Sequence, residues 1–144
     1  MPPPEPNISR LLRDALRTLE RETLRRLHAA GYPDISVAQT KLLGDLDEDG
    51  SAQGVLVERS GLTAQAVSQL IEQLVGLGYL AREALPGDRR ARRIVWTEHG
   101  RRGRAVALEL LAEMEAELAQ RVGERRYATA RRTLRQIAEQ SPGD

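Results

Sequence analysis

Cysteine and phenylalanine are both absent from this sequence of 144 residues, and aromatic residues make up only 3% of it. Without cysteine the chain can form no disulfide, no thiolate metal site and no cysteine-based redox switch. The shortage of aromatic rings argues against a binder of RNA or single strands, because those modes rely on bases stacking on aromatic side chains. What is left is one domain, or one subunit of a small oligomer, with a modest core.

Long apolar runs and catalytic motifs are missing as well. No stretch approaches the length of a membrane span, and the first residues, MPPPEPN, lack the basic start and apolar run of a signal peptide. There is no HExxH, GxSxG or phosphate-cradling glycine loop, and His28 and His99 are too far apart to imply a shared site. We therefore expect a soluble cytoplasmic protein that is not an enzyme and uses no metal and no cofactor.

Charge is balanced in total but unevenly distributed. The formal net charge is only +1. Residues 45–58 contain five acidic residues and no basic one, whereas residues 82–104 contain eight arginines against three acidic residues. This segregation gives the second stretch the positive charge that contact with phosphates requires.

The acidic stretch partly matches a calcium-binding loop. Residues 45–50 (DLDEDG) have oxygen-bearing side chains at positions one, three and five of an EF-hand loop and its glycine at position six. Position twelve, which needs a bidentate Glu, is Leu56, and Glu58 comes two residues too late. We interpret the run as an acidic turn that ends a helix, and a calcium-responsive protein remains the weakest alternative.

Residues 62–77 have the pattern of a helix with one buried face. Thr63 is a suitable N-cap, because its hydroxyl can accept a bond from a free amide of the first turn, and Gly76 and Gly78 weaken the far end. Residues 79–97 then read as two short extended runs joined by Pro86-Gly87, a pair suited to a type II turn. The expected buried stripe consists of Leu62, Val67, Leu70, Ile71, Leu74 and Leu77.

A helix with small polar side chains, followed by a hairpin with arginines at its tip, is typical of a winged helix-turn-helix. Such a helix fits the major groove, where Gln, Ser and Thr can read base edges. The arginines suit phosphates or a narrow minor groove. An ordinary solvated helix face is the competing interpretation, and the adjacent wing favours the functional one. The candidate DNA-reading residues are Thr63, Gln65, Ala66, Ser68, Gln69 and Gln73.

Residues 88–97 (DRRARRIVWT) resemble the wing signature of the multiple-antibiotic-resistance regulator (MarR) family. Residues 56–63 (LVERSGLT) resemble the family's junction between scaffold helix and recognition helix, with departures at Val57 and Ser60. The resemblance implies that Arg90 contacts DNA and that Asp88 braces the wing through an ion pair. It also puts Trp96 in the core. The candidate wing contacts are Asp88, Arg89, Arg90 and Arg92.

The rest of the chain is predicted to be helical. Apolar spacing predicts a helix from Ser9 that ends near Gly31, and a second helix capped by Ser36. Residues 51–59 are ambiguous, because Gly54 disfavours a helix and the apolar run 55–57 also suits a strand; the family resemblance favours a helix. After the wing, Thr97 caps a long helix that Gly123 separates from a last one.

The expected fold is therefore mostly α with a small β-hairpin wing: a winged helix-turn-helix between N- and C-terminal dimerisation helices. The expected divisions are a disordered arm at 1–7, an N-terminal dimerisation helix at 8–34, the winged helix-turn-helix DNA-binding lobe at 35–97, and C-terminal dimerisation helices at 98–144.

Apolar stripes at both ends of the chain predict a homodimer. Two-fold symmetry would place two recognition helices about 34 Å apart and so favour a near-palindromic site in double-stranded DNA. The resemblance implies a repressor whose effector is a small phenolic or carboxylate compound. The alternative is a winged-helix module that binds an acidic protein instead of DNA. The effector would bind near four residues that otherwise have ordinary surface roles: Arg13, Arg17, His28 and Tyr32.

Overall fold

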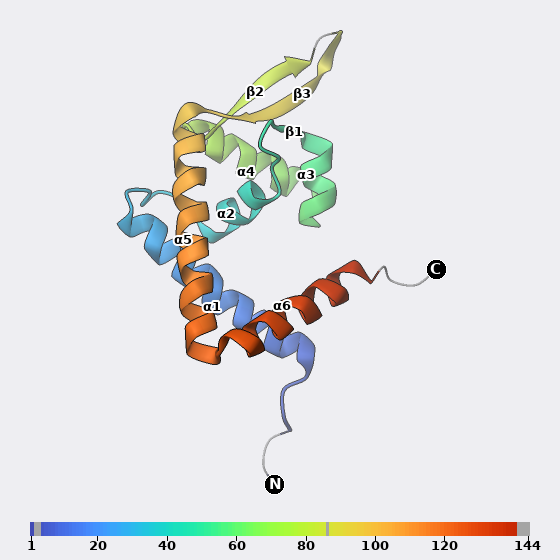
Figure 1. Ribbon diagram of the computed structural model, residues 1–144. Helices are drawn as coiled ribbons and strands as arrows, with labels where there is room; N and C mark the ends of the chain where they lie inside the picture. The colour runs from blue at the N-terminus through green and yellow to red at the C-terminus, as the bar shows by residue number, and fades with distance from the viewer. Residues whose placement is uncertain (2–3, 86, 141–144) are drawn as a thin grey trace. The chain divides into compact units, whose positions relative to one another are not determined.

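The structure is a computed structural model that describes residues 1, 4–85 and 87–140; the side chains of residues 85 and 88–91 lie outside that description. The chain divides into two compact units within its longest helix, at 1–107 and 108–144. The elements, coloured along the chain in Figure 1, are α1 (Ile8–Ala29), α2 (Val37–Gly44), β1 (Ser51–Ala52), α3 (Gln53–Ser60), α4 (Ala64–Gly76), β2 (Leu80–Leu85), β3 (Asp88–Trp96), α5 (Glu98–Val122) and α6 (Glu124–Glu139).

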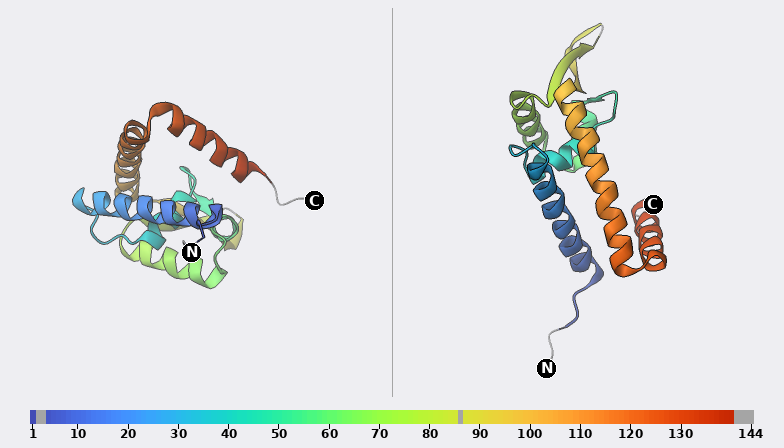
Figure 2. Two further views of the ribbon diagram at one scale, coloured as in Figure 1. Left: turned by 90° about the horizontal axis from the view of Figure 1, so that it is seen from below. Right: turned by 60° about the vertical axis from the view of Figure 1, so that its left-hand side comes forward.

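The fold class expected from the sequence is confirmed: helices predominate, and the strands form one small antiparallel sheet in the order β1-β3-β2. The hairpin of β2 and β3 extends well beyond the helices of its own unit (Figure 2, right). The two-residue strand β1 was not predicted. Its strand character comes from pairing of Ser51 with Ile94 and of Ala52 with Arg93, which no local pattern encodes.

Hydrogen bonds from backbone amides to side-chain oxygens fix the starts of four helices. Asn7, Ser36 and Thr63 each accept a bond from a backbone N–H three residues later, and the last two confirm the predicted caps of α2 and α4. Thr97 does the same for α5 through the amide of Gly100. Each cap satisfies an amide that has no partner inside its helix, so these sequence signals set where the helices begin.

The core of the winged lobe lies between α2, α3, α4 and the sheet. Val67, Ile71 and Leu74 of α4 are fully buried, as the predicted stripe requires. Leu62 is a correction: it is 44% exposed, because Thr63 caps the helix and leaves Leu62 in the turn before it. The remaining buried apolar side chains of the lobe are Ile35, Leu42, Leu46, Leu56, Tyr79, Leu80, Ile94 and Trp96.

The first turns of α5 pack closely on Tyr79, which precedes β2, and on Tyr32, in the loop after α1. A Cβ at Gly100 would overlap the carbonyl oxygen of Tyr79, and a Cβ at Gly103 would lie 3.1 Å from the ring of Tyr32. The hydroxyl of Thr97 also donates to the carbonyls of Gly78 and Tyr79. Glycine is therefore required where the helix meets β2, and α5 begins at a fixed position on the sheet.

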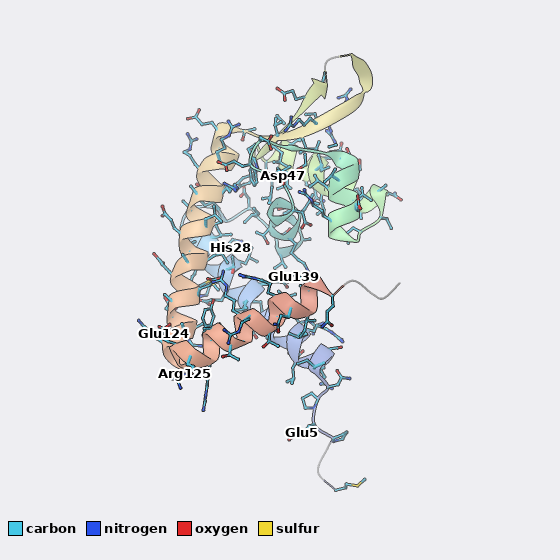
Figure 3. The ribbon with its side chains drawn as sticks, turned by 45° about the vertical axis from the view of Figure 1, so that its right-hand side comes forward. Glu5, His28, Asp47, Glu124, Arg125 and Glu139 are labelled. Atoms are coloured by element: carbon cyan, nitrogen blue, oxygen red, sulfur yellow. The ribbon has the colours of Figure 1, made fainter. Side chains whose placement is uncertain are left out.

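The second unit contains the end of α5 and all of α6. Within it Arg131 of α6 forms a 3.1 Å ion pair with Glu115 of α5. Figure 3 marks the two ends of α6 by Glu124 and Glu139. No residue of α6 is buried, and Leu134 and Ile137 are 47% and 46% exposed. Among the described helices of the chain, none has the length and apolar character needed to cross a membrane.

Candidate nucleic-acid interface

The outer face of α4 is polar and uncovered within its own unit. Gln65, Gln69, Glu72 and Gln73 are exposed, and Ser68 is half-buried. The burial alternates with helical period, because Val67, Ile71 and Leu74 on the opposite face make up the core. The helix thus presents a row of amide and hydroxyl groups of the kind that can read base edges in a major groove.

The remaining candidates on α4 have additional roles. Thr63 caps the helix through its hydroxyl oxygen, which lies 3.1 Å from the amide of Ala66. Ala66 is half-buried in the first turn. The side-chain oxygen of Gln73 accepts a 3.0 Å hydrogen bond from the side chain of Gln39 on α2, so part of Gln73 is already engaged inside the protein.

The hairpin separates its arginines by sheet face. Arg82 pairs with Ile94 and Ala84 with Arg92, so Arg82 and Arg92 share one face, whereas Arg93 lies on the other. Both Arg82 and Arg92 are exposed, and the described residues offer neither of them an acidic partner. These two guanidinium groups are available to bind an anion.

The tip of the hairpin contains the remaining wing candidates. The backbone of residues 88–91 belongs to β3, and Gly87 has a φ of 89°, as the second central residue of a type II turn requires. Pro86 and the side chains of Asp88, Arg89 and Arg90 lie outside the described residues. The DNA contact expected of Arg90 and the ion pair expected of Asp88 therefore stay predictions.

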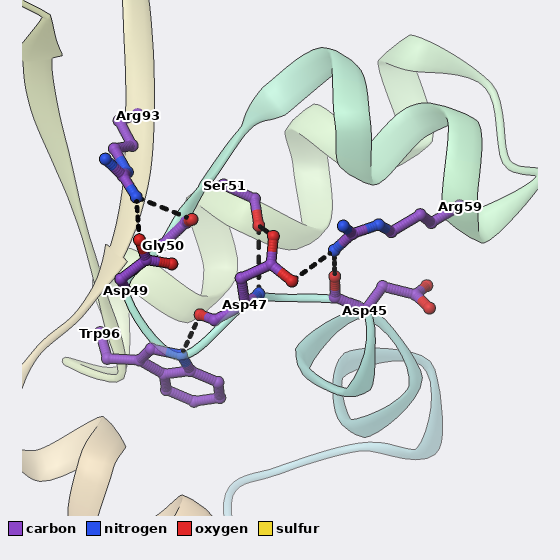
Figure 4. Close-up of polar contacts among 8 residues, drawn as sticks. All are labelled: Asp45, Asp47, Asp49, Gly50, Ser51, Arg59, Arg93 and Trp96. Atoms are coloured by element: carbon purple, nitrogen blue, oxygen red, sulfur yellow. Dashed lines mark hydrogen bonds and ion pairs between the residues drawn. The ribbon is translucent and has the colours of Figure 1, made fainter.

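The acidic turn between α2 and β1 forms a network that the sequence analysis did not find (Figure 4). Asp47 accepts 3.0 Å bonds from Arg59 and from the hydroxyl of Ser51. Asp49 pairs with Arg93 at 3.0 Å. The hydrogen bond from Arg59, followed by the one from Ser51, lowers the pKa of Asp47 below its ordinary value. Two of the three carboxylates that resembled an EF-hand, those of Asp47 and Asp49, are thus bound to arginines.

The indole N–H of Trp96 completes this network. It donates a 3.0 Å hydrogen bond to the backbone carbonyl of Asp47, whose place in the lobe is labelled in Figure 3. Trp96 itself is 5% exposed, so its expected place in the core is confirmed. The sequence signal for this network is the segregation of acidic residues at 45–58 from arginines at 82–104, but this pattern does not specify which pairs form.

The four residues expected near an effector lie on α1 and the loop after it. Arg13 and Arg17 are exposed one turn apart on α1, and His28 lies 2.8 Å from the carbonyl of Ile35 through its Nε2. Tyr32 instead joins a ring cluster, with centroids 6.2 Å from Tyr79 and 5.7 Å from His99. Among the described residues no hydrogen bond or ring contact joins these four to one another.

Tyr79 is the centre of that ring cluster. Its hydroxyl donates a 2.8 Å bond to Asp34, and its ring centroid is 4.7 Å from that of His99. Burial, and then the bond to Asp34, raise the pKa of the Tyr79 phenol above its ordinary value. The phenol therefore stays neutral and links the loop after α1 to the start of β2.

Comparison with known proteins supports this geometry. Residues 34–91 match the family model of the MarR family. The fold is similar to a crystal structure of MarR (TM-score 0.76, 23% identity, 93% of this chain and 96% of that chain) and to a Staphylococcus aureus MepR–DNA complex (0.75, 23%, 93% and 97%). A MarR transcriptional regulator from Methanosarcina mazei gives 0.77 at 22% identity, covering 92% of this chain and 94% of that chain. No curated protein sequence matches.

These likenesses extend over nearly all of the chain, and at these identities they establish its fold. The family match covers the helix-turn-helix and the first part of the wing. The MarR family consists of transcription regulators and not of enzymes. Residues 34–91 are therefore similar to the MarR family, as the wing motif implied, and the chain as a whole has the fold of the MarR structures.

Proposed function

We propose that this protein is a homodimeric transcription regulator that binds double-stranded DNA in a sequence-specific manner and acts as a repressor. The observation that carries the proposal is the uncovered polar face of α4, beside a hairpin whose Arg82 and Arg92 have no acidic partner among the described residues. A reading helix and a cationic hairpin together supply base contacts and phosphate contacts. One of the similar structures is a complex of MepR with DNA.

The homodimer is proposed because each unit leaves apolar side chains exposed. Exposed apolar stripes of this size mark interfaces. A two-fold dimer would present two copies of α4 to a near-palindromic operator, about one turn of duplex apart. The exposed apolar residues of the helices outside the winged lobe are Ile8, Leu11, Leu16 and Leu19 in α1 and Leu108, Leu111, Val122, Leu134 and Ile137 in α5 and α6.

Regulation by a small phenolic or carboxylate effector is proposed as a part of the same function. An effector that binds the DNA-free arrangement of the dimer more tightly than the DNA-bound one lowers operator affinity. The change equals the difference between its two binding free energies. Arg13, Arg17, His28 and Tyr32 are the candidates, of which Arg13 and Arg17 are solvent-exposed cations able to pair with a carboxylate. Calorimetric titration with salicylate, compared for the wild type and Arg17→Ala, tests this point; equal heats would remove Arg17 from the site.

The experiment that tests DNA binding is a titration of the protein into duplex fragments of its own upstream region at two salt concentrations. Specific binding that weakens with salt supports the proposal, because each neutralised phosphate releases counterions. Equal, weak binding to every fragment would favour the alternative, a winged-helix module for an acidic protein partner. A footprint on the bound fragment then gives the operator and its symmetry.

A further inference from the structure

The wing leaves the three-stranded sheet at Arg93. This residue is the outermost one of β3 that pairs on both sides, with Ala52 of β1 and with Glu83 of β2. The next pair outward, Ala84 with Arg92, belongs to the hairpin alone. Because a two-stranded hairpin is only marginally stable without other support, contacts at this residue decide the direction in which the wing projects.

The acidic turn supplies those contacts. The Nη2 atom of Arg93 lies 3.0 Å from the Asp49 carboxylate and 3.2 Å from the carbonyl oxygen of Gly50. Gly50 has a φ of 96°, and a Cβ there would come within 2.6 Å of the carbonyl oxygen of Ile94. The turn therefore packs directly against β3. It contacts the base of the wing through the backbone of Gly50 and the side chain of Asp49.

The same turn is attached to the helix-turn-helix on its other side. Arg59, in the last turn of α3, reaches the Asp47 carboxylate at 3.0 Å and the carbonyl oxygen of Asp45 at 2.7 Å. Only the residues from Gly61 to Thr63 separate α3 from α4. Figure 4 shows Arg59 and Arg93 approaching the turn from opposite sides. One short segment thus contacts the base of the wing and the helix that precedes the reading helix.

We propose that the acidic turn Asp47–Gly50 positions the wing for DNA, and that Asp49 does so through Arg93 without touching nucleic acid itself. This inference rests on the proposed function. It makes Asp49 a positioning residue and Arg93 its link to the hairpin, while Arg92 on the opposite face stays available for phosphate. The expected change in DNA affinity is opposite to the one that electrostatics alone predicts. Removing a negative charge near a DNA-binding surface should strengthen binding, whereas removing that of Asp49 should weaken it.

The test compares Asp49→Asn with Glu48→Gln. The two substitutions remove equal charge at adjacent exposed positions, but Glu48 has no ion pair among the described residues. Binding of the footprinted duplex is measured by fluorescence anisotropy at several salt concentrations. We expect Asp49→Asn to weaken binding by about two- to fivefold, the range of an exposed ion pair, and to flatten the salt dependence. Glu48→Gln should bind as well as the wild type or better.

Equal or tighter binding by Asp49→Asn would overturn the positioning role. If neither the wild type nor Glu48→Gln binds the duplex, the proposed function itself is refuted. Failure of the positioning role and failure of the proposed function therefore give different results. Asp49 has an 83% exposed side chain, and a thermal melt confirms that its variant folds.

A charge exchange provides the second test. Arg93→Asp alone should weaken binding, and Arg93→Asp combined with Asp49→Arg should recover most of it, because the ion pair is restored with reversed polarity. A double variant that binds as poorly as Arg93→Asp would mean that Arg93 itself contacts phosphate, and this outcome overturns the proposal.

Discussion

The side-chain amide of Gln39 donates a 3.0 Å hydrogen bond to the side-chain oxygen of Gln73, which lies 34 residues further along the chain. Gln39 is only 6% exposed, and its side-chain oxygen accepts a bond from the amide of Ser36 at the start of α2. This buried amide therefore joins the start of α2 to the last part of α4. The orientation of the reading face depends on it in part.

Replacing Gln39 with alanine should lower the free energy of unfolding by about 1–3 kcal/mol, because two side-chain hydrogen bonds are lost and buried groups are left unpaired. Urea unfolding of both proteins measures the difference. Gln73→Ala is the matched control: it removes the same inter-helix bond but keeps the bond from the Ser36 amide to the side chain of Gln39, so it should cost less. A loss for Gln39→Ala no larger than for Gln73→Ala would argue against a stabilising role of the bond between the Ser36 amide and the side chain of Gln39.

Sequence preference should depend on the exposed amides of α4. Gln65→Ala or Gln69→Ala is expected to relax preference by about 1–3 kcal/mol at one base pair, since a bidentate amide contact to a base edge is worth that much. Binding to a set of operators with single-base changes measures this. If each variant keeps the wild-type ranking of those operators, the amides take no part in the readout.

Neutralising Arg90 and Arg92 should weaken binding to all duplexes alike. Each lost phosphate contact is expected to flatten the logarithmic dependence of affinity on salt by about one unit of slope. Arg10→Ala is a suitable control, because Arg10 is an exposed residue of α1, outside the winged lobe. An unchanged slope in the Arg90→Ala, Arg92→Ala variant would show that the wing stays in solvent.

Features of the fold whose physical signal is local follow from the sequence. Ser36 and Thr63 were predicted as caps, and both hydroxyls accept a bond from an amide three residues away. Gly87 adopts the positive φ that its place after a proline predicts. The buried face of α4 followed from helical spacing for the same reason, because period and capping involve residues within a few positions of each other.

Contacts between residues that are distant in the chain do not follow from the sequence. Trp96 bonds to Asp47 across 49 positions, and Arg93 reaches Gly50 across 43. Nothing in residues 45–50 distinguishes carboxylates that bind arginine from carboxylates that bind calcium, except the missing ligand at position 56. The strand β1 was missed for the same reason, because its two residues are extended only through their pairing with β3.

Association into a dimer should depend on the apolar stripe of α6. Leu134→Glu places a charge at a position that we expect to be buried between two copies, and the loss of one buried leucine alone is worth about 1.5–3 kcal/mol. Light scattering after gel filtration should show a dimer for the wild type and a monomer for the variant at micromolar concentration. Arg132→Glu, on another face of the same helix, is the control. A monomeric wild type would contradict the dimer itself.

Stability in acid should depend on Glu22 of α1. Hydrogen bonds from Arg25 and then Arg26 lower its pKa from 4.5 to about 2. Because the folded protein holds the proton less tightly than the unfolded chain, this carboxylate stabilises the fold above pH 4.5, and the stabilisation is lost as the pH falls towards about 2. The melting temperature of Glu22→Gln should therefore lie below that of the wild type at neutral pH, and the gap should narrow over this interval. Glu5→Gln, in the segment before α1, controls for the loss of one charge. A gap that stays constant from pH 7 to pH 2 would mean that the two arginines do not favour the ionised form.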